Sequence, residues 1–232
     1  MTVNRYDDFV SLLLETGFTV LVGGGAGAPF ALLQGSWTDT PPEHSPIRWH
    51  TGDPDTDPWQ WRIRLLTERD DVAYAKLFFG RAGYVTREWA PFFLSARRRG
   101  RDLGEAYEDG LVSRAAKLVY DEIAPKDGLS MFKLRKLFKQ RGGWGTEHER
   151  ALIELQRRMD ITVAGEEYPE SHGRSRGWPS SVFTTSERFW SEDLMREAAR
   201  LDAADAAGRI EVQIARYYPN AKPAAIRRFI EG

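Results

Sequence analysis

The chain has 232 residues, of which 41% are hydrophobic and 29% charged, a balance typical of a globular protein rather than a disordered one. It contains no cysteine, which excludes disulfides, cysteine-bound zinc and thiol catalysis, and its net charge of −1 excludes a globally basic nucleic-acid binder. No apolar run approaches the roughly 18 residues that a membrane span needs, and the N-terminus lacks a signal-peptide pattern. We therefore expect a soluble, cytoplasmic protein with no membrane contact, no cofactor and no metal.

The first 110 residues predict a mixed α/β region that is rich in tryptophan. Hydrophobic periodicity, together with the glycines and prolines that end elements, predicts a helix over 6–16 ended by Gly17, a strand over 18–22 and a loop over 35–58. A helix over 59–69 and a helix over 86–99 follow. Between them, residues 74–86 form either a strand–turn–strand or a short helix and a strand. Asp57 is expected to cap the helix that follows it, with Pro58 at the first helical position.

From Ser113 onward the pattern predicts a winged helix. The expected elements are a helix from 113 that ends at Pro125, a short extended bridge at 129–130 with Ser130 as the next cap, a helix over 131–141, a glycine-rich turn, a helix over 146–159, a strand over 161–165, a polar loop over 166–177 and a returning strand over 178–190. Thr146 is expected to cap the third helix, with Glu149 completing a capping box. Helix, bridge, helix, turn, helix and hairpin is the order of a winged helix.

The rest of the chain predicts helices. Ser191 is expected to cap the first of them, Gly208 to interrupt it, and a last short helix to follow Pro219. The whole sequence therefore predicts an α+β, mostly helical fold in three parts: an N-terminal mixed α/β region (1–110), a winged-helix domain (111–190) and a C-terminal helical segment (191–232) packed on the rest.

Two segments carry a resemblance to a known family. WHTGDPDTDPWQWRIRLL (49–66) and YAKLFFGRAGYVTREWAPFFLSARRR (74–99), followed by the winged-helix pattern, resemble the AlkZ-related bacterial proteins, short relatives of the AlkZ/YcaQ-type winged-helix DNA glycosylases. The resemblance implies an association with DNA and its repair. The glycosylases use a Gln-x-Gln or Gln-x-Asp motif, and none of the five glutamines here stands in that spacing, so no catalytic residue is carried over.

The second helix of the predicted winged helix and the tip of its hairpin are the candidate nucleic-acid surface. The helix has no acid and five basic residues: Lys133, Arg135, Lys136, Lys139 and Arg141. Arg174 and Arg176 lie in the hairpin loop between glycines, a setting that suits contact with a phosphate backbone or a minor groove. The alternatives are a solvated helix face paired with nearby acids and an ordinary hairpin tip.

The third helix carries acids where a major-groove reader would face DNA. Glu147 and Glu154 repel phosphates, which counts against sequence-specific binding. If this helix does not read DNA, we expect the winged helix to pack against another part of the chain or a protein partner.

The loop before the helix at 59–69 is the candidate pocket. In this hypothesis a flipped base or a planar ligand stacks on the aromatic residues Trp49, Trp59 and Trp61. The carboxylates that act on that ligand or on water are Asp53 and Asp57. The alternative is that these acids cap the helix, whose dipole favours negative charge at that end.

A basic cluster at Arg97, Arg98, Arg99 and Arg101 has two interpretations: an extension of the phosphate track, or cations placed at a helix C-terminus.

The sequence favours a DNA-associated, repair-related protein that binds the duplex mainly through backbone charge and without sequence specificity. Glycosylase-like release of a damaged base stays open. The alternative function is a non-catalytic module that uses the winged helix to bind a protein partner or a small ligand. The sequence does not give an oligomeric state.

Overall fold

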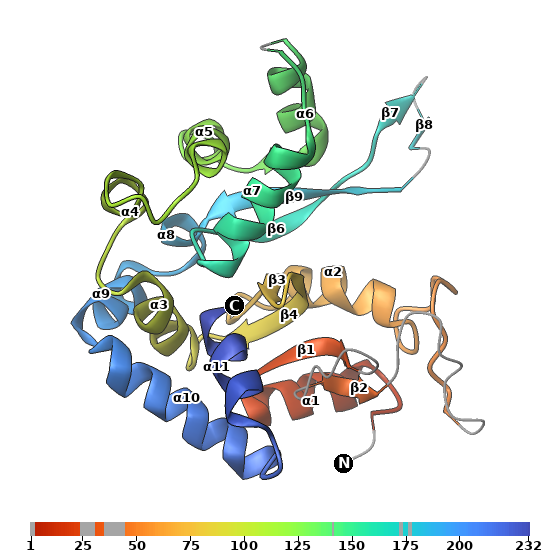
Figure 1. Ribbon diagram of the computed structural model, residues 1–232. Helices are drawn as coiled ribbons and strands as arrows, with labels where there is room; N and C mark the ends of the chain where they lie inside the picture. Colours follow the sequence, from red (N-terminus) through yellow and green to blue (C-terminus); the bar gives the residue numbers. More distant parts are fainter. Residues whose placement is uncertain (1–2, 24–30, 35–44, 141, 172–173, 176–177) are drawn as a thin grey trace.

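The computed structural model describes residues 3–23, 31–34, 45–140, 142–171, 174–175 and 178–232. The predicted α+β, mostly helical class is confirmed. Figure 1 shows two lobes, one above the other, with the N-terminal half and the blue C-terminal helices in the lower lobe. In the part of the chain that the structure describes, no helix is both long enough and apolar enough to cross a bilayer.

One seven-stranded sheet runs through both lobes. Its strand order is β2 (Ala31–Gln34), β1 (Phe18–Gly23), β4 (Arg81–Thr86), β3 (Val72–Phe78), β6 (Ile161–Glu167), β9 (Ser180–Thr185) and β5 (Leu129–Ser130). Among the strands that the structure describes, only β1 and β2 pair in parallel. The lobes meet where β3 pairs with β6, with Tyr74 opposite Val163. Residues almost 90 positions apart in sequence thus become neighbours, and this pairing places the candidate site.

The lower lobe begins as predicted, with α1 (Tyr6–Thr16), which Gly17 ends in the left-handed conformation. A side chain at Gly17 would lie 2.1 Å from the Trp89 ring, so both its φ of 87° and the close contact require glycine. Asp57 and Pro58 open α2 (Pro58–Glu68), which confirms the predicted cap. Of the two interpretations of 74–86, the structure has the strand–turn–strand.

Helix α3 (Ala90–Arg98) begins later than the predicted 86–99, after a turn. A short helix that we did not predict, α4 (Leu103–Glu108), follows it. Asp102 and Glu105 form a capping box at its start, and that local signal was present in the sequence.

The upper lobe contains α5 (Arg114–Ile123), β5, α6 (Met131–Lys139), α7 (Thr146–Arg157), β6 and β9, in that chain order. Strand β9 pairs with β5 on one side and β6 on the other, both antiparallel. Two short strands, β7 (Glu170–Ser171) and β8 (Arg174–Ser175), extend the hairpin. Buried apolar residues from α4 to β9, Val119, Leu134 and Phe183 among them, form a core of their own.

Two local predictions in this lobe were wrong. Gly145, not Thr146, caps α7, and its N–H donates to His148 Nδ1 (3.1 Å), while Glu149 turns toward Arg135 and Trp144. The returning strand ends at Thr185, which caps the short helix α8 (Ser186–Phe189). The contact with Arg135 on α6 draws Glu149 away from the cap, whereas the end of the strand is local, because the Thr185 hydroxyl accepts a hydrogen bond from the Arg188 N–H (3.3 Å).

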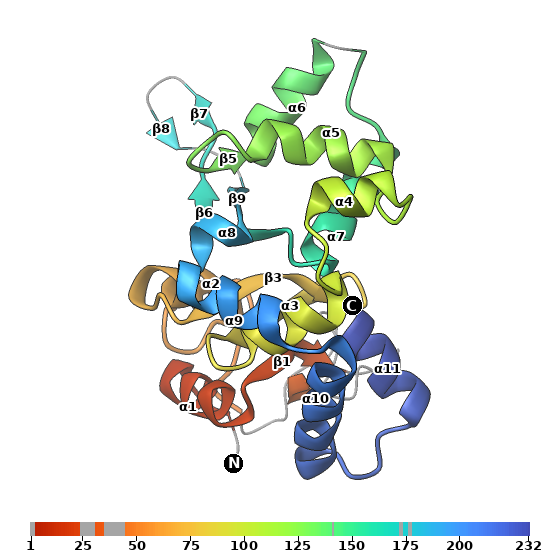
Figure 2. The ribbon, with the colours of Figure 1, turned by 90° about the vertical axis from the view of Figure 1, so that its left-hand side faces the viewer.

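Helices α9 (Glu192–Arg200), α10 (Ala203–Tyr217) and α11 (Pro223–Glu231) return to the lower lobe. Ile210, Phe229 and Ile230 pack with Phe18 and Phe78 in one core, and Figure 2 shows α10 and α11 at the lower end beside β1. The prediction that Gly208 interrupts a helix was wrong, because α10 runs through it and the break lies at Asp202, which caps α10.

Candidate nucleic-acid interface

Helix α7, the third helix of the upper lobe, lies between α5 and β3. Gln156 is buried on α7, and its Oε1 accepts a hydrogen bond from the backbone N–H of Lys76 on β3 (2.9 Å). Glu154 accepts from the N–H and the hydroxyl of Ser113 (2.8 and 2.7 Å). Because α5 and β3 cover two sides of α7, the face that carries Glu147, Arg150 and Arg157 is the exposed one.

The basic residues of α6 divide into a paired and an unpaired set. Lys133 Nζ lies 3.1 Å from Glu167 Oε1 on β6, and Arg135 Nη2 lies 2.7 Å from Glu149 Oε1 on α7. Lys136 and Lys139 are exposed and have no carboxylate partner among the described residues. Arg141 lies outside the described residues.

The acids that pair with α6 are ionised at neutral pH. Hydrogen bonds from Ser130 and then Lys133 hold the pKa of Glu167 below its usual value. Burial raises the pKa of Glu149, but the hydrogen bonds from Arg135 and Trp144 outweigh that effect and lower it. Two of the four described α6 cations are therefore neutralised, and Lys136 and Lys139 carry the free charge.

The hairpin and α6 lie at the same end of the molecule in both ribbon views (Figures 1 and 2). Arg174 belongs to β8, which pairs with β7, whereas Arg176 lies outside the described residues. We call this end, formed by α6 and the β7–β8 hairpin, the basic end.

The two candidate carboxylates occupy different environments in the loop before α2. Asp57 is buried, and its two oxygens accept from the N–H groups of Trp59 (2.9 Å) and Gly52 (3.0 Å). Asp53 is exposed and accepts from the Asp55 N–H (2.8 Å), and this backbone hydrogen bond lowers the pKa of Asp53. Asp57 thus holds the loop against the helix, and Asp53 is an ionised carboxylate at neutral pH.

The three candidate tryptophans have different surroundings. Trp61 is fully buried and stacks on Phe9, with ring centroids 5.2 Å apart. Trp49 packs partly buried against the same core. Trp59 is half-buried, with the guanidinium of Arg62 3.5 Å from its ring centroid.

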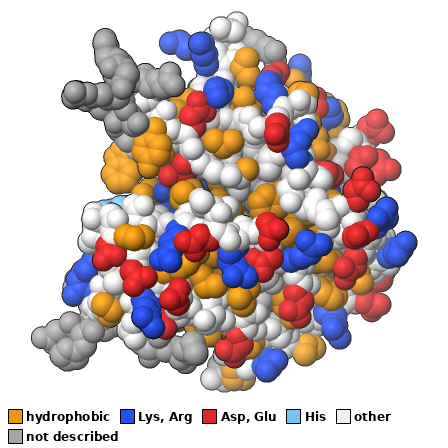
Figure 3. All heavy atoms as spheres, turned by 180° about the vertical axis from the view of Figure 1, so that it is seen from behind, with side chains coloured by type: hydrophobic (Ala, Val, Ile, Leu, Met, Phe, Trp, Pro, Cys, Tyr) orange, Lys and Arg blue, Asp and Glu red, His pale blue; other side chains and the backbone are white. Residues whose placement is uncertain are grey.

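Trp59 belongs instead to an aromatic cluster that joins the lobes. Trp178, just before β9, meets both His50 and Trp59 edge-on, with centroid distances of 5.6 Å in each case. We call His50, Trp59 and Trp178 the aromatic cluster. Trp178 is 66% exposed, and Figure 3 shows a hydrophobic patch beside the grey hairpin residues. Trp178 was not among the predicted site residues, although a lone tryptophan at the start of a predicted strand next to a polar loop is a usable signal.

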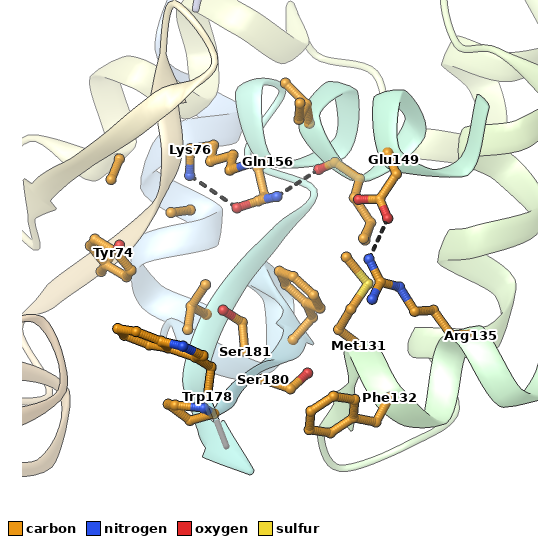
Figure 4. Close-up of a pocket in the computed structure, with 17 residues that line it drawn as sticks. Tyr74, Lys76, Met131, Phe132, Arg135, Glu149, Gln156, Trp178, Ser180 and Ser181 are labelled. Carbon is orange, nitrogen blue, oxygen red and sulfur yellow. Dashed lines mark hydrogen bonds and ion pairs between the residues drawn. The ribbon is translucent and has the colours of Figure 1, made fainter. Parts of the chain in front are cut away.

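A groove of about 390 Å³ opens beside Trp178, between α6, α7 and the sheet. We call it the junction groove. In Figure 4, Trp178 and Phe132 lie on opposite sides, with Ser180 and Ser181 between them. The Arg135–Glu149 ion pair and the Lys76–Gln156 hydrogen bond lie along its far wall. The groove combines apolar walls with a few charged groups, which is the usual character of a ligand site.

A buried ion pair joins α2 to β6 beside the aromatic cluster. Arg62 on α2 and Glu166 on β6 lie 2.5 Å apart, and both side chains are 7% exposed. Arg62 therefore makes two contacts at the same time: its guanidinium stacks on Trp59, and it pairs with Glu166 of the upper lobe.

The basic cluster at the end of α3 is not a continuous phosphate track. Arg97 is buried and donates to the carbonyls of Arg157, Phe229 and Ile230, where α7 and α11 end. Arg98 pairs with Asp160 and Glu187, and Arg101 pairs with Asp109. Arg97 therefore fits the second interpretation, in which the cations lie at helix C-termini.

Acidic and basic side chains alternate over the face seen in Figure 3, without a broad basic band. The described residues contain no group of histidines and acids placed to hold a metal ion.

The family model described as AlkZ related matches residues 3–231, nearly the whole chain. No curated protein and no solved structure matches the chain significantly. The extent of the family match, over both lobes and the groove between them, establishes that the chain belongs to the AlkZ-related family.

Proposed function

We propose that this is a DNA-associated, repair-related protein that binds the phosphate backbone at its basic end. In this proposal residues 111–190 are a winged helix, set between an N-terminal region (1–110) and a C-terminal segment (191–232). The strand order β6–β9–β5 and the preceding three helices support that assignment. Family membership supports the link to DNA.

The observation that carries the proposal is the free charge on α6. Lys136 and Lys139 lack carboxylate partners among the described residues, and they lie on the same end as the arginine-bearing hairpin. Each phosphate that a cation neutralises releases a counterion, so affinity falls as salt rises.

The position of α7 supports binding without sequence specificity. A major-groove reader needs a free helix face, and β3 covers one face of α7 while Glu147 adds an exposed negative charge. Contacts to phosphates position a protein on DNA but carry no sequence information.

A salt titration of duplex binding tests the proposal. The Lys136→Ala/Lys139→Ala variant is expected to bind more weakly, and the slope of log affinity against log salt is expected to fall by about 1.8, or 0.9 for each lost phosphate contact. Lys222→Ala, which removes one positive charge before α11 at the other end of the molecule, is the control and leaves the slope unchanged. Absence of binding at low salt, or affinity that does not respond to salt, would overturn the proposal.

Release of a damaged base is a separate question for Asp53 and Asp57. If either carboxylate acts in catalysis, base release from alkylated DNA disappears in Asp53→Asn or Asp57→Asn. The Asp57 variant needs a folding control, because its carboxylate holds two backbone N–H groups. No release across a panel of lesions would leave binding alone.

The alternative is a non-catalytic module that binds a protein partner or a small ligand, and one observation favours it. The pairing of Lys133 and Arg135 with acids reduces the charge of α6, and the junction groove lies beside this helix. Salt-independent behaviour in the titration, with no duplex bound, would favour this function.

A further inference from the structure

We propose that the junction groove binds one unpaired nucleotide of a DNA strand whose backbone lies on the basic end. This inference rests on the proposed function and deepens it. It predicts that the protein prefers DNA containing an unpaired base over an intact duplex.

The walls of the groove suit a planar ring. Trp178 on the hairpin and Phe132 on α6 flank its mouth, and they are 66% and 37% exposed although both are large and apolar. Bases stack on exposed aromatic side chains without regard to sequence, because every base has a π-face. The volume of about 390 Å³ lies within the range of roughly 300–1,000 Å³ that small-molecule sites occupy.

The lobes hold Trp178 in place rather than leaving it loose. Its indole packs edge-on against His50 and Trp59, and Trp59 is backed by Arg62 of the buried ion pair. A ring fixed in advance loses little conformational entropy when a base stacks on it.

The polar groups of the groove suit a nucleotide. Lys76 is exposed on one wall, and Arg135 faces Glu149 on another, so the described groove carries one net positive charge. The hydroxyl of Ser180, a groove residue only 7% exposed, has no hydrogen-bond partner in the part of the chain that the structure describes. A buried hydroxyl without a partner costs free energy, which a base edge recovers only where binding uncovers the Ser180 oxygen.

The charge continues beyond the groove, which distinguishes a nucleic-acid strand from a free planar metabolite. Lys136 and Lys139 follow Arg135 on the same helix and have no acidic partner among the described residues. A strand with one base in the groove can therefore carry its neighbouring phosphates along α6.

The test compares a short labelled duplex with the same duplex carrying one unpaired central nucleotide, by fluorescence anisotropy with the full chain. We expect the duplex with the unpaired nucleotide to bind about tenfold more tightly, which corresponds to about 1.4 kcal/mol. Trp178→Ala and Phe132→Ala are each expected to lose this preference and to keep the affinity for the intact duplex. Tyr107→Ala on α4, which removes an aromatic ring that is also 37% exposed, keeps both.

A second readout follows the base itself. With 2-aminopurine as the unpaired base, its fluorescence is expected to be quenched on binding to the native protein and to the Tyr107 variant, and to recover with Trp178→Ala. If loss of Trp178 loosens the contact between the lobes, Phe132→Ala still tests the groove, because it removes the other aromatic wall without touching the aromatic cluster.

Equal affinity for the two duplexes, with normal salt dependence, would overturn the groove inference and leave the proposed function standing. Absence of binding to either duplex would overturn both. A preference that survives in both Trp178→Ala and Phe132→Ala would place the nucleotide elsewhere.

Discussion

At the scale of single residues, two acids only four positions apart differ in burial and in structural role. Asp57 is buried and accepts two backbone hydrogen bonds, whereas Asp53 is exposed at the turn before it. The cap at Asp57 was predictable, but the two acids shared one hypothetical site because the sequence does not tell which of them is buried. The difference is one of solvent access.

The first prediction follows from this difference. Asp57→Ala is expected to lower the free energy of unfolding by about 1–2 kcal/mol, because a buried N-cap is lost and two N–H groups lose their acceptor. Asp53→Ala, which removes an exposed carboxylate, is expected to change it by less than about 0.5 kcal/mol. Urea unfolding followed by circular dichroism measures both. Equal midpoints for the two variants would contradict the assignment of Asp57 as a cap.

The second prediction at this scale concerns Arg97, the buried cation of the lower lobe. Burial lowers its pKa to about 9, so the guanidinium is still charged at neutral pH, where three carbonyl oxygens accept its hydrogen bonds. Arg97→Met is expected to cost about 3 kcal/mol or more, because buried carbonyls at two helix ends lose their donors. Arg99→Met, two residues on and exposed, is the matched control and is expected to be nearly neutral.

At the scale of the element, α6 shows how neighbouring elements decide the charge of a basic helix. Its sequence has no acid, yet Glu167 of β6 and Glu149 of α7 neutralise two of its cations. Only the packing of α6 beside these two elements brings the acids within reach, so composition alone overestimates the charge that is free for a polyanion.

The third prediction uses one of these acids. Glu167→Gln is expected to release Lys133, to strengthen duplex binding at low salt and to increase the magnitude of the salt slope by up to about 0.9. Glu192→Gln, which removes a highly exposed acid at the start of α9, is the control for net charge. If both variants strengthen binding equally, the effect is one of global charge and Lys133 is not part of the surface.

At the scale of the whole molecule, several contacts join the two lobes, among them a strand pairing, a buried ion pair and an aromatic cluster. The β3–β6 pair continues the sheet, Arg62 binds Glu166, and Trp178 meets Trp59. The junction groove exists only because these contacts hold the upper lobe beside β3.

The fourth prediction tests the ion pair. Glu166→Gln is expected to cost about 3–5 kcal/mol, since it leaves the buried Arg62 without its charged partner, whereas Arg62→Met/Glu166→Leu is expected to be close to neutral. The unfolding midpoint of the single and double variants measures this difference. A double variant as unstable as the single one would show that the pair does more than compensate its own burial.

The sequence by itself determined most of the local structure. The helix ends at Gly17, Asp57, Ser130 and Ser191 and the strands around 74–86 follow from periodicity and capping, which depend on residues within about four positions of one another. For the same reason the order of elements in the upper lobe was predictable, and the family resemblance rested on continuous segments.

Only the tertiary structure decided the candidate site. The cover of β3 over α7 joins Lys76 to Gln156, which are 80 positions apart, and the groove beside Trp178 is bounded by residues from both lobes. No local pattern specifies which of many apolar strands will pair across that distance, because the free energy of the pairing comes from contacts that exist only after the chain has folded. Local sequence therefore determined the elements, and their packing in the tertiary structure formed the candidate site.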